Sequence, residues 1–257
     1  MSENYNIFKV LKLQHKETIH SAMIAAIASH NSQSREAFYE MLKKKHVFKS
    51  GIATERTYRK GIECLNLSID YNSNRQWIDT EKNLKENVLR KDKQGKDKQV
   101  SVNRGRADIW IGTNRKIWNA ADGNPETKQF RLIIENKINA GNQDRQLRRY
   151  YRYLIGNNRE NAGLFFLCVK NCEYCRHQAE DSAITYNSES GDNKEYPTEY
   201  SIITYEEDIK NWLEEVIKTA DGDFREVVKD YYKLVTEELV KKWKPKKDKY
   251  NKSLKTS

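Results

Sequence analysis

Hydrophobic and polar positions follow helical periods near the start of the 257-residue chain. In residues 15–29, Ile19, Met23 and Ile27 recur four apart, which predicts a helix with one buried stripe. A second helix is predicted from Ser34, which would be its N-cap, with an apolar side formed by Phe38, Met41 and Leu42.

The next stretch, residues 47–98, has a weaker pattern. The segment "ECLNLSIDYN" fits either a strand or a helix. The segment "DTEKNLKENVLRKDKQGKDK" that follows is expected to form a charged helix that runs into a loop.

Beyond residue 98 the pattern becomes that of strands. Val100 and Val102 alternate with polar neighbours, as in a half-buried strand, and Gly105 permits a turn into a returning strand, "ADIWIG". The segment "GLFFLCV" is almost wholly apolar, as in a strand buried on both faces. The strands are expected at residues 98–104, 107–112, 130–138, 163–169 and 200–205, with helices at 143–155, 206–218 and 224–243 and irregular structure at 170–199.

This order of elements predicts an α/β fold in which helices flank a mixed central sheet. The chain shows no internal repeat and no linker rich in Pro, Gly and Ser, so residues 1–240 are expected to form a single domain. Residues 241–257 contain eight lysines and one acidic residue, and they are expected to form a basic, flexible tail.

The charge of the chain points to polyanionic partners. Lys and Arg number 47 against 37 Asp and Glu, so the net charge is +10, and the pI is near 9.2. Such an excess favours nucleic acid or an anionic membrane surface. No segment approaches the roughly 18 apolar residues of a membrane span, and the N-terminus lacks the features of a signal peptide, so a cytoplasmic location is expected. The four cysteines are then expected to be thiols.

Three charged residues at the ends of two predicted strands suggest chemistry. Side chains two apart share a face of a strand, so Glu135 and Lys137 point the same way. If the strand with Asp108 is a neighbour, the two carboxylates approach each other and repel unless a positive charge lies between them. A divalent cation such as Mg²⁺ suits hard oxygen ligands. The cation would activate water and neutralise a phosphoryl oxygen, while Lys137 would orient the water, help to remove its proton or stabilise negative charge. These are the requirements of phosphodiester hydrolysis.

The same residues resemble the PD-(D/E)xK nuclease superfamily, in the bacterial branch with a Glu-Asn-Lys strand and a Gln-Leu-x-x-Tyr helix. The segments "RADIWIG", "IIENKI", "QLRRYYRYL" and "ETIHS" carry the resemblance over residues 15–155, with Ala107 where the superfamily name has Pro. The resemblance implies a restriction-endonuclease-like core of order αβββαβ, Mg²⁺ or Mn²⁺ as cofactor, and cleavage of nucleic acid, with DNA favoured. It implies Glu17, Asp108 and Glu135 as metal ligands, with the Asn136 carbonyl as a further ligand, and roles for Gln146 and Tyr150 beside the site. Enzymes of this kind also act as homodimers or with defence and repair proteins.

The helix after the metal strand is rich in arginine and tyrosine. The arginines Arg145, Arg148, Arg149 and Arg152 recur three and four apart, so one side of the helix would present guanidinium groups to phosphates. The interleaved tyrosines are expected to serve the core more than to stack on bases.

Several alternatives remain open at the level of sequence. The charged residues could form a surface salt-bridge cluster, Glu17 could be an exposed acid, and His20 could belong to the core. Gln146 could orient Lys137 or contact substrate. Cys172 and Cys175 have the spacing of a zinc knuckle, with Cys168 and His177 nearby, but a second distant pair is missing. The competing functions are a nucleic-acid-binding module without catalysis on the same fold, and an adaptor whose basic tail contacts an acidic protein.

Overall fold

The centre of the computed structural model is a five-stranded mixed sheet with the strand order β1-β2-β5-β6-β7. β1 pairs antiparallel with β2, β2 pairs antiparallel with β5, and β5, β6 and β7 run parallel. The strands are β1 (Ile78–Lys91), β2 (Asp97–Gly112), β5 (Arg131–Lys137), β6 (Ala162–Cys168) and β7 (Ser201–Thr204). A separate two-stranded sheet joins β3 (Ile117–Trp118) and β4 (Pro125–Glu126). The structure describes residues 16–45, 78–91, 94–112, 117–118, 125–126, 131–139, 145–158, 162–183 and 198–244.

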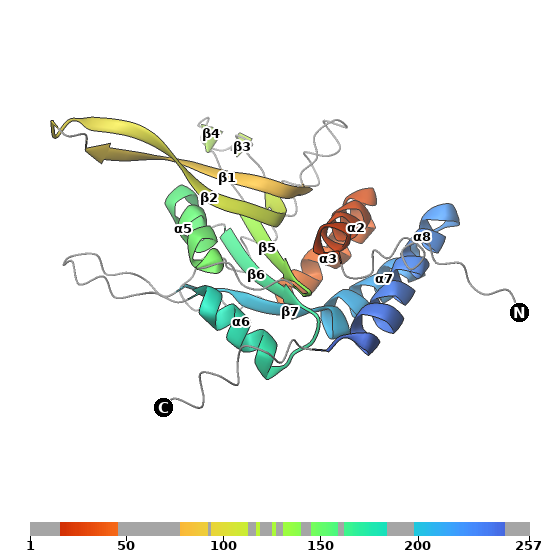
Figure 1. Ribbon diagram of the computed structural model, residues 1–257. Coiled ribbons are helices and arrows are strands. Elements are labelled where there is room, and N and C mark those ends of the chain that lie inside the picture. The colour runs from red at the N-terminus through yellow and green to blue at the C-terminus, as the bar shows by residue number, and fades with distance from the viewer. Residues whose placement is uncertain are drawn as a thin grey trace, which may run out of the picture.

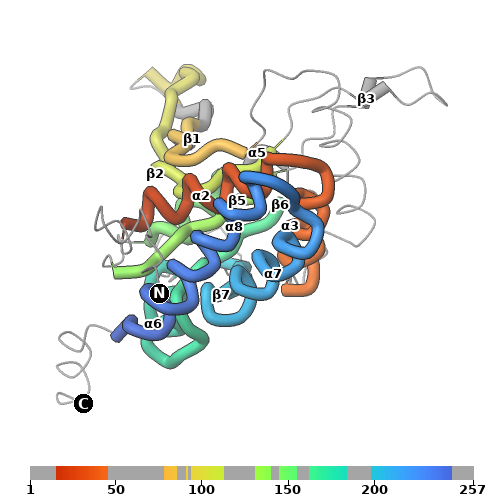
Figure 2. The backbone as a smooth tube through the Cα atoms, turned by 90° about the vertical axis from the view of Figure 1, so that its right-hand side faces the viewer, coloured from red at the N-terminus to blue at the C-terminus, as the bar shows by residue number. Residues whose placement is uncertain are grey.

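Helices cover both faces of the five-stranded sheet, as Figure 1 and the rotated view of Figure 2 show. One face is covered by α2 (Glu17–His30), α3 (Ser32–Lys45), α7 (Lys210–Thr219) and α8 (Gly222–Lys233), with the π-helices η2 (Tyr205–Ile209) and η3 (Leu234–Val240). The other face is covered by α5 (Gln146–Asn158) and α6 (Glu173–Ala183). The α/β fold with a mixed central sheet between helices is therefore confirmed.

Two hydrophobic cores lie on opposite sides of the sheet because side chains alternate along its strands. Leu132 and Ile134 of β5 pack with the α2 side, whereas Ile133 packs with the α5 side. All seven residues of β5 and all seven of β6 are buried, as expected for central strands covered on both faces. The strand ends that carry Glu135 and Lys137 are thus held between two packed layers.

The charged segment after residue 78 is a strand, so the helix predicted there was wrong. β1 pairs with β2 from Ile78–Ile111 to Lys91–Asp97. Its polar residues are accommodated because this long ribbon lies at the edge of the sheet, where much of its surface meets water. The segment "ECLNLSIDYN" lies outside the described residues.

Gly105 does not form the turn that the sequence suggested. β2 continues through it, and the strand that returns is β1. Gly105 adopts φ +120° where the register shifts between Leu84 and Lys85, so it forms a bulge instead. The hairpin reverses near Gly95, whose φ is +77°.

Two smaller predictions also require correction, while a third, the buried side of α3, is right. α3 begins at Ser32, and Asn31 Oδ1 accepts a hydrogen bond from Ser34 N at 2.8 Å, so the capping side chain is Asn31 rather than Ser34. The segment 170–199, expected to be irregular, contains α6. Phe38, Met41 and Leu42 are buried as predicted.

The first residues of the predicted tail are packed against the body of the protein. Lys241 and Lys242 continue the last helix, and Trp243 Nε1 donates to the carbonyl oxygen of Ile138 at 2.9 Å. Trp243 therefore contacts the body of the protein, and residues 245–257 lie outside the described part of the chain. Within the described ranges, no helix is long and apolar enough to cross a membrane.

Candidate active site

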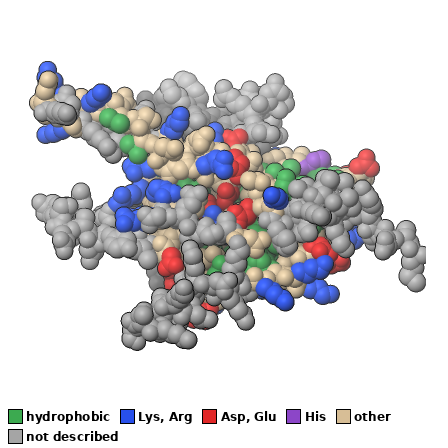
Figure 3. All heavy atoms as spheres, in the orientation of Figure 1, with side chains coloured by type: hydrophobic (Ala, Val, Ile, Leu, Met, Phe, Trp, Pro, Cys, Tyr) green, Lys and Arg blue, Asp and Glu red, His purple; other side chains and the backbone are tan. Residues whose placement is uncertain are grey.

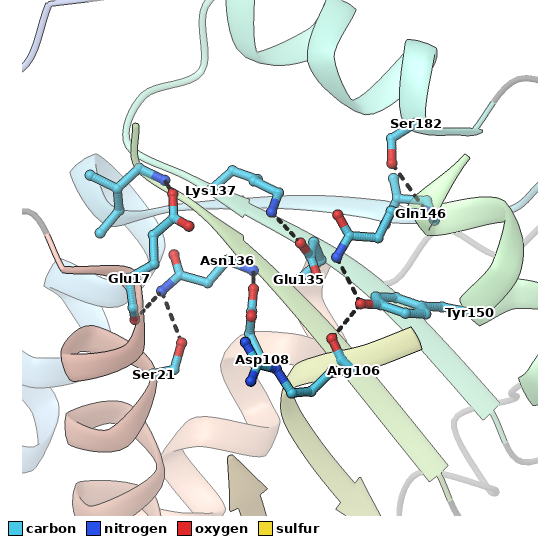
Figure 4. A network of polar contacts seen from close by, with 12 residues as sticks. Glu17, Ser21, Arg106, Asp108, Glu135, Asn136, Lys137, Gln146, Tyr150 and Ser182 are labelled. Atoms are coloured by element: carbon cyan, nitrogen blue, oxygen red, sulfur yellow. Dashed lines mark hydrogen bonds and ion pairs between the residues drawn. The ribbon is translucent and has the colours of Figure 1, made fainter. Parts of the chain in front are cut away.

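The predicted site residues of β5 divide between the two faces of the sheet. Glu135 and Lys137 lie on the side of α5, whereas Asn136 points toward α2 (Figure 4). Glu135 and Asn136 are fully buried, and Lys137 is 8% exposed. The alternative of an exposed surface salt-bridge cluster is therefore wrong for Glu135 and Lys137.

Asp108 reaches the same point from β2. Ile109 pairs with Ile134 in the antiparallel ladder, which brings Asp108 beside Glu135. The half-buried Asp108 accepts a hydrogen bond at Oδ2 from the backbone N–H of Asn136 at 2.7 Å. The two acids and the lysine thus meet where β2 and β5 adjoin, as the alternation of side chains predicted.

Glu135 is the most deeply buried acid of the group. Its Oε1 lies 2.5 Å from Lys137 Nζ in an ion pair, and contacts with Lys137 and Tyr150 favour its ionised form. Burial, together with the nearby negative charge of Asp108, raises the pKa of Glu135 to about 8. A carboxylate in this position needs further positive charge if it is to remain ionised.

The pKa values of Asp108 and Lys137 are both raised, although burial acts on them in opposite directions. Burial raises the pKa of Asp108 to about 6, although Lys137 and the Asn136 N–H oppose the shift. Burial lowers the pKa of Lys137, but the surrounding carboxylates, with Glu135 the largest contributor, more than reverse that effect and raise it overall. Lys137 is therefore an ammonium group at neutral pH.

Glu17 stands at the first turn of α2 and connects that helix to the end of β5. Its Oε1 accepts hydrogen bonds from the backbone N–H groups of Ile138 at 2.8 Å and Asn139 at 3.0 Å. Its negative charge also acts on Asp108 and Lys137, so Glu17 lies near the acids although one of its oxygens binds backbone.

The side chain of Asn136 anchors β5 to the helical layer. Its Nδ2 donates to the Glu17 carbonyl at 3.1 Å and to Ser21 Oγ at 3.0 Å, and its Oδ1 accepts from Tyr205 OH at 3.1 Å. Ser21 and Tyr205 were not predicted from the sequence, because nothing in their local pattern indicates a contact more than 60 residues away along the chain. His20, the alternative site residue, is fully buried, and its Nδ1 lies 3.1 Å from Tyr231 OH, so it belongs to the core.

Gln146 and Tyr150 form the wall of the site on the α5 side. Gln146 Nε2 donates to Tyr150 OH at 2.8 Å, and Tyr150 OH donates to the Arg106 carbonyl at 2.5 Å (Figure 4). Gln146 Oε1 is buried without a hydrogen-bond partner among the described residues. The amide therefore has an acceptor left for a group that enters the site.

Glu81 is an acid near the site that the sequence analysis missed. It lies in β1 between residues paired with Ala107 and Ile109, and its negative charge contributes to the raised pKa of Asp108. Its φ is +56°, a rare conformation for a residue other than glycine, and its Oε2 lies 2.6 Å from Arg106 Nε. The missed strand β1 explains why this residue was overlooked.

The arginines of α5 and Arg145, which immediately precedes this helix, do not all face solvent. Arg145 and Arg152 are exposed, Arg149 is half-buried with its Nε 3.3 Å from the Arg104 carbonyl, and Arg148 is 5% exposed. Tyr150 and Tyr151 are buried, which favours the core role expected for the tyrosines.

The few carboxylates at the site suit a divalent cation that keeps several water ligands better than one that is surrounded entirely by protein ligands. Among the described side chains, no group of three or more His, Cys, Asp and Glu is close enough to hold a metal ion. Mg²⁺ in proteins is commonly bound by only one or two carboxylates, with waters and substrate phosphate completing its shell. The fully buried Glu135 and the adjacent, half-buried Asp108 fit that description.

The three described cysteines gather at the end of β6, where Cys168 pairs with Lys137 of β5. Cys168 and Cys175 are buried and Cys172 is half-buried, all as free thiols, and the sulfur atoms of Cys172 and Cys175 are 3.4 Å apart. The nearby His177 instead lies beside two glutamates: its Nε2 is 3.5 Å from Glu173 Oε1, and its Nδ1 is 3.2 Å from Glu180 Oε2.

The comparison with protein families agrees with the geometry. The model of the PD-(D/E)XK nuclease superfamily matches residues 5–233, so it spans most of the chain. The chain therefore belongs to the PD-(D/E)XK nuclease superfamily. This membership supports a nuclease-type function with nucleic acid as substrate, and nucleases of this superfamily generally use divalent metals. No curated protein and no solved structure gave a significant match.

Proposed function

We propose that this protein is a metal-dependent nuclease that hydrolyses phosphodiester bonds in DNA. The observation that carries the proposal is the fully buried Glu135 carboxylate, which lies beside Asp108 and has a pKa raised to about 8 although it is paired with Lys137. Two adjacent carboxylates in such a buried position are costly to ionise unless a further positive charge binds them.

Asp108 and Glu135 would hold the cation with the backbone carbonyl of Asn136, while Glu17, whose Oε1 accepts hydrogen bonds from backbone N–H groups, would act on the cation through a water molecule. When bound, Mg²⁺ or Mn²⁺ supplies a Lewis acid that neutralises charge on a phosphoryl oxygen and lowers the pKa of water. The hydrogen bond from Asn136 N orients Asp108, and the contacts of Asn136 with α2 fix the end of β5. These interactions keep the acids in place before substrate arrives.

Lys137 would act at the attacking water and the phosphate. Because its pKa is raised, the ammonium is protonated at neutral pH and donates hydrogen bonds rather than accepting a proton. We therefore favour orientation of the water and stabilisation of developing negative charge over proton removal. Gln146, through its buried Oε1, would accept a hydrogen bond from the water. The exposed Arg145 and Arg152 and the half-buried Arg149 would bind the DNA backbone, whereas Arg148 is too deeply buried for that role.

A cleavage assay tests the proposal. Plasmid, linear duplex DNA and single-stranded RNA would be incubated with Mg²⁺, with Mn²⁺ or with EDTA, using wild-type protein, Glu135→Gln and Lys137→Gln. We expect cutting of DNA only with metal, and a loss of at least about 100-fold in each variant, as for removal of a key electrostatic group. Glu173→Gln is the matched control, since this acid is 90% exposed on α6 and should cut like wild type.

Thermal melts of the same samples show whether each variant is folded. If a folded Glu135→Gln variant cut DNA at the wild-type rate, the proposed site would be wrong. If wild-type protein cut nothing but bound DNA equally with and without metal, the non-catalytic binding module would replace the nuclease.

A further inference from the structure

The hairpin of β1 and β2 extends well beyond the sheet. β2 pairs with β5 only over residues Ile109–Gly112, whereas its pairing with β1 continues to Asp97. We call residues 85–104 the arm; its described residues, 85–91 and 94–104, belong to a two-stranded ribbon that projects away from the helices in Figure 1. The arm begins next to the site, since Asp108 follows it on the same strand.

The arm and the adjacent end of α5 carry a concentration of positive charge. Residues 85–104 contain seven Lys or Arg and three Asp or Glu. Lys91, Lys96 and Lys98 near the tip are exposed. Figure 3 shows Lys and Arg side chains along the arm and over the neighbouring part of the body on the same face. The surface is therefore suited to a long polyanion rather than to a small anion.

Arginines at the base of the arm add to this surface. Arg149 Nε donates to the Arg104 carbonyl, so α5 lies against the arm. The pKa of Arg152 is lowered by partial burial and by the positive charges of Arg148, Arg104 and Arg145. These guanidinium groups are thus close enough to repel one another, and phosphates placed over them would relieve the repulsion.

The composition and shape of the arm suit one kind of nucleic acid better than others. Residues 85–104 contain no Trp, Tyr or Phe, and single strands are usually bound by stacking bases on aromatic side chains. A two-stranded β-ribbon fits the major groove of B-form DNA, whereas the major groove of A-form RNA is too narrow for side chains to read. The arm therefore favours duplex DNA.

The length of the arm sets the extent of the contact. Twelve residues separate Lys96 from Asp108, which is about 40 Å at a rise of about 3.3 Å per residue. This length corresponds to about 12 base pairs, since duplex DNA rises about 3.4 Å per pair.

We propose that the arm lies along the major groove of duplex DNA and contacts about 12 base pairs on one side of the phosphate at the active site. The arginines at the base of the arm would bind the DNA backbone where the major groove approaches Asp108 and Glu135. The position of the active site relative to the DNA rests on the proposed nuclease function, but the contact between arm and duplex does not.

Binding without cleavage tests the arm separately from catalysis. The full-length triple variant Lys91→Gln, Lys96→Gln and Lys98→Gln would be titrated in EDTA with labelled DNA over a range of salt. The probes are duplexes of about 40 and about 8 base pairs, longer and shorter than the expected contact, and a single strand of about 40 nucleotides. The control variant Lys218→Gln, Lys229→Gln and Lys242→Gln removes the same charge from three exposed lysines of α7, α8 and the last helix.

We expect the arm variant to bind the long duplex at least about tenfold more weakly, with a salt slope less steep by about 2–3, as for three lost phosphate contacts. Its affinity for the short duplex and the single strand should fall much less, and the control variant should match wild type. Unchanged affinity for the long duplex, or an equal loss on the single strand, would overturn the proposal.

Cleavage by the same proteins separates the two proposals. Arm-dependent duplex binding by a wild-type protein that never cuts DNA would support the arm and contradict the nuclease. Cutting by wild type, with no effect of the arm variant on binding, would contradict the arm and leave the nuclease intact.

Discussion

At the scale of single residues, the main feature of the site is that burial disfavours the ionised form of its carboxyl groups. The pKa of Glu135 is raised to about 8 and that of Asp108 to about 6, so both carboxyls retain protons more readily than usual. A divalent cation binds the ionised forms, so metal and protons compete for the same oxygens. Metal binding should consequently strengthen as the pH rises.

The stability of the protein should report this competition. Because the folded-state pKa of Glu135 lies above its ordinary value of 4.5, ionisation destabilises the metal-free fold as the pH rises toward about 8. Mg²⁺ should restore stability, so we expect its effect on the melting temperature to be small near pH 6 and larger near pH 8. A hundredfold excess over Kd would contribute about 2.7 kcal/mol, or about 5–10 °C.

Glu135→Gln provides the comparison for the melting experiment. Glutamine keeps the size of the side chain but does not titrate. In this variant, the decline in stability with rising pH should be smaller, and Mg²⁺ should raise the melting temperature much less. Equal stabilisation of wild-type protein by Mg²⁺ at both pH values would contradict proton competition at this site.

The sequence predicted the central residues of the site better than the residues that surround them and hold them in place. Asp108, Glu135 and Lys137 could be brought together because strand periodicity alone fixes which side chains share a face. Asn136 donates a hydrogen bond to Ser21 and accepts one from Tyr205; these bonds join segments that are distant in sequence, and no local pattern encodes them. Glu81 was missed because its segment was expected to be a helix.

At the scale of elements, the error over β1 has a physical cause. The segment contains many Lys and Glu residues, which favour helices in isolation, and it lacks the strict alternation of a half-buried strand. Its strand conformation is specified by pairing with β2 over its whole length. In contrast, β5 and β6 were predicted correctly because their nearly continuous apolar residues match strands covered on both faces.

The bulge at Gly105 connects the arm to the wall of the site and can be tested directly. A Cβ at this position would lie 3.0 Å from Tyr150 Cε1, in a backbone with φ +120°. Tyr150 is fully buried and hydrogen-bonded, so it has little freedom to move away. We expect Gly105→Ala to lower the free energy of unfolding by about 2–4 kcal/mol, from backbone strain and overpacking together.

Gly95→Ala is the matched control for this substitution. Gly95 also has positive φ, at +77°, but nothing lies within 4 Å of its added Cβ. Only backbone strain should act there, so the loss in urea unfolding should be about 1 kcal/mol. Equal losses at the two glycines would show that contact with Tyr150 has no role.

At the scale of the whole molecule, Trp243 connects the C-terminal helix to both cores. Its ring packs against hydrophobic clusters on either side of the sheet, and its Nε1 donates to the carbonyl of Ile138. The N–H of the same Ile138 donates to Glu17. The end of the last helix therefore supports the strand end that carries Lys137.

Two truncations separate this support from the basic segment beyond it. Removing residues 241–257 deletes Trp243 and should lower the free energy of unfolding by about 2–4 kcal/mol, as expected for loss of a large, half-buried aromatic side chain that packs on both cores. Removing residues 245–257 retains Trp243 and should leave stability unchanged. The point variant Trp243→Ala should reproduce most of the first effect, which urea unfolding of all three proteins would measure.

The shorter truncation also tests the adaptor hypothesis. Residues 245–257 include five lysines, so an adaptor that binds acidic partners through its tail would lose that binding when they are removed. A nuclease that holds DNA through the arm and α5 should keep its affinity for a long duplex within about twofold. If instead the truncated protein lost most of its duplex binding while remaining as stable as wild type, the tail rather than the arm would be the principal contact with polyanions.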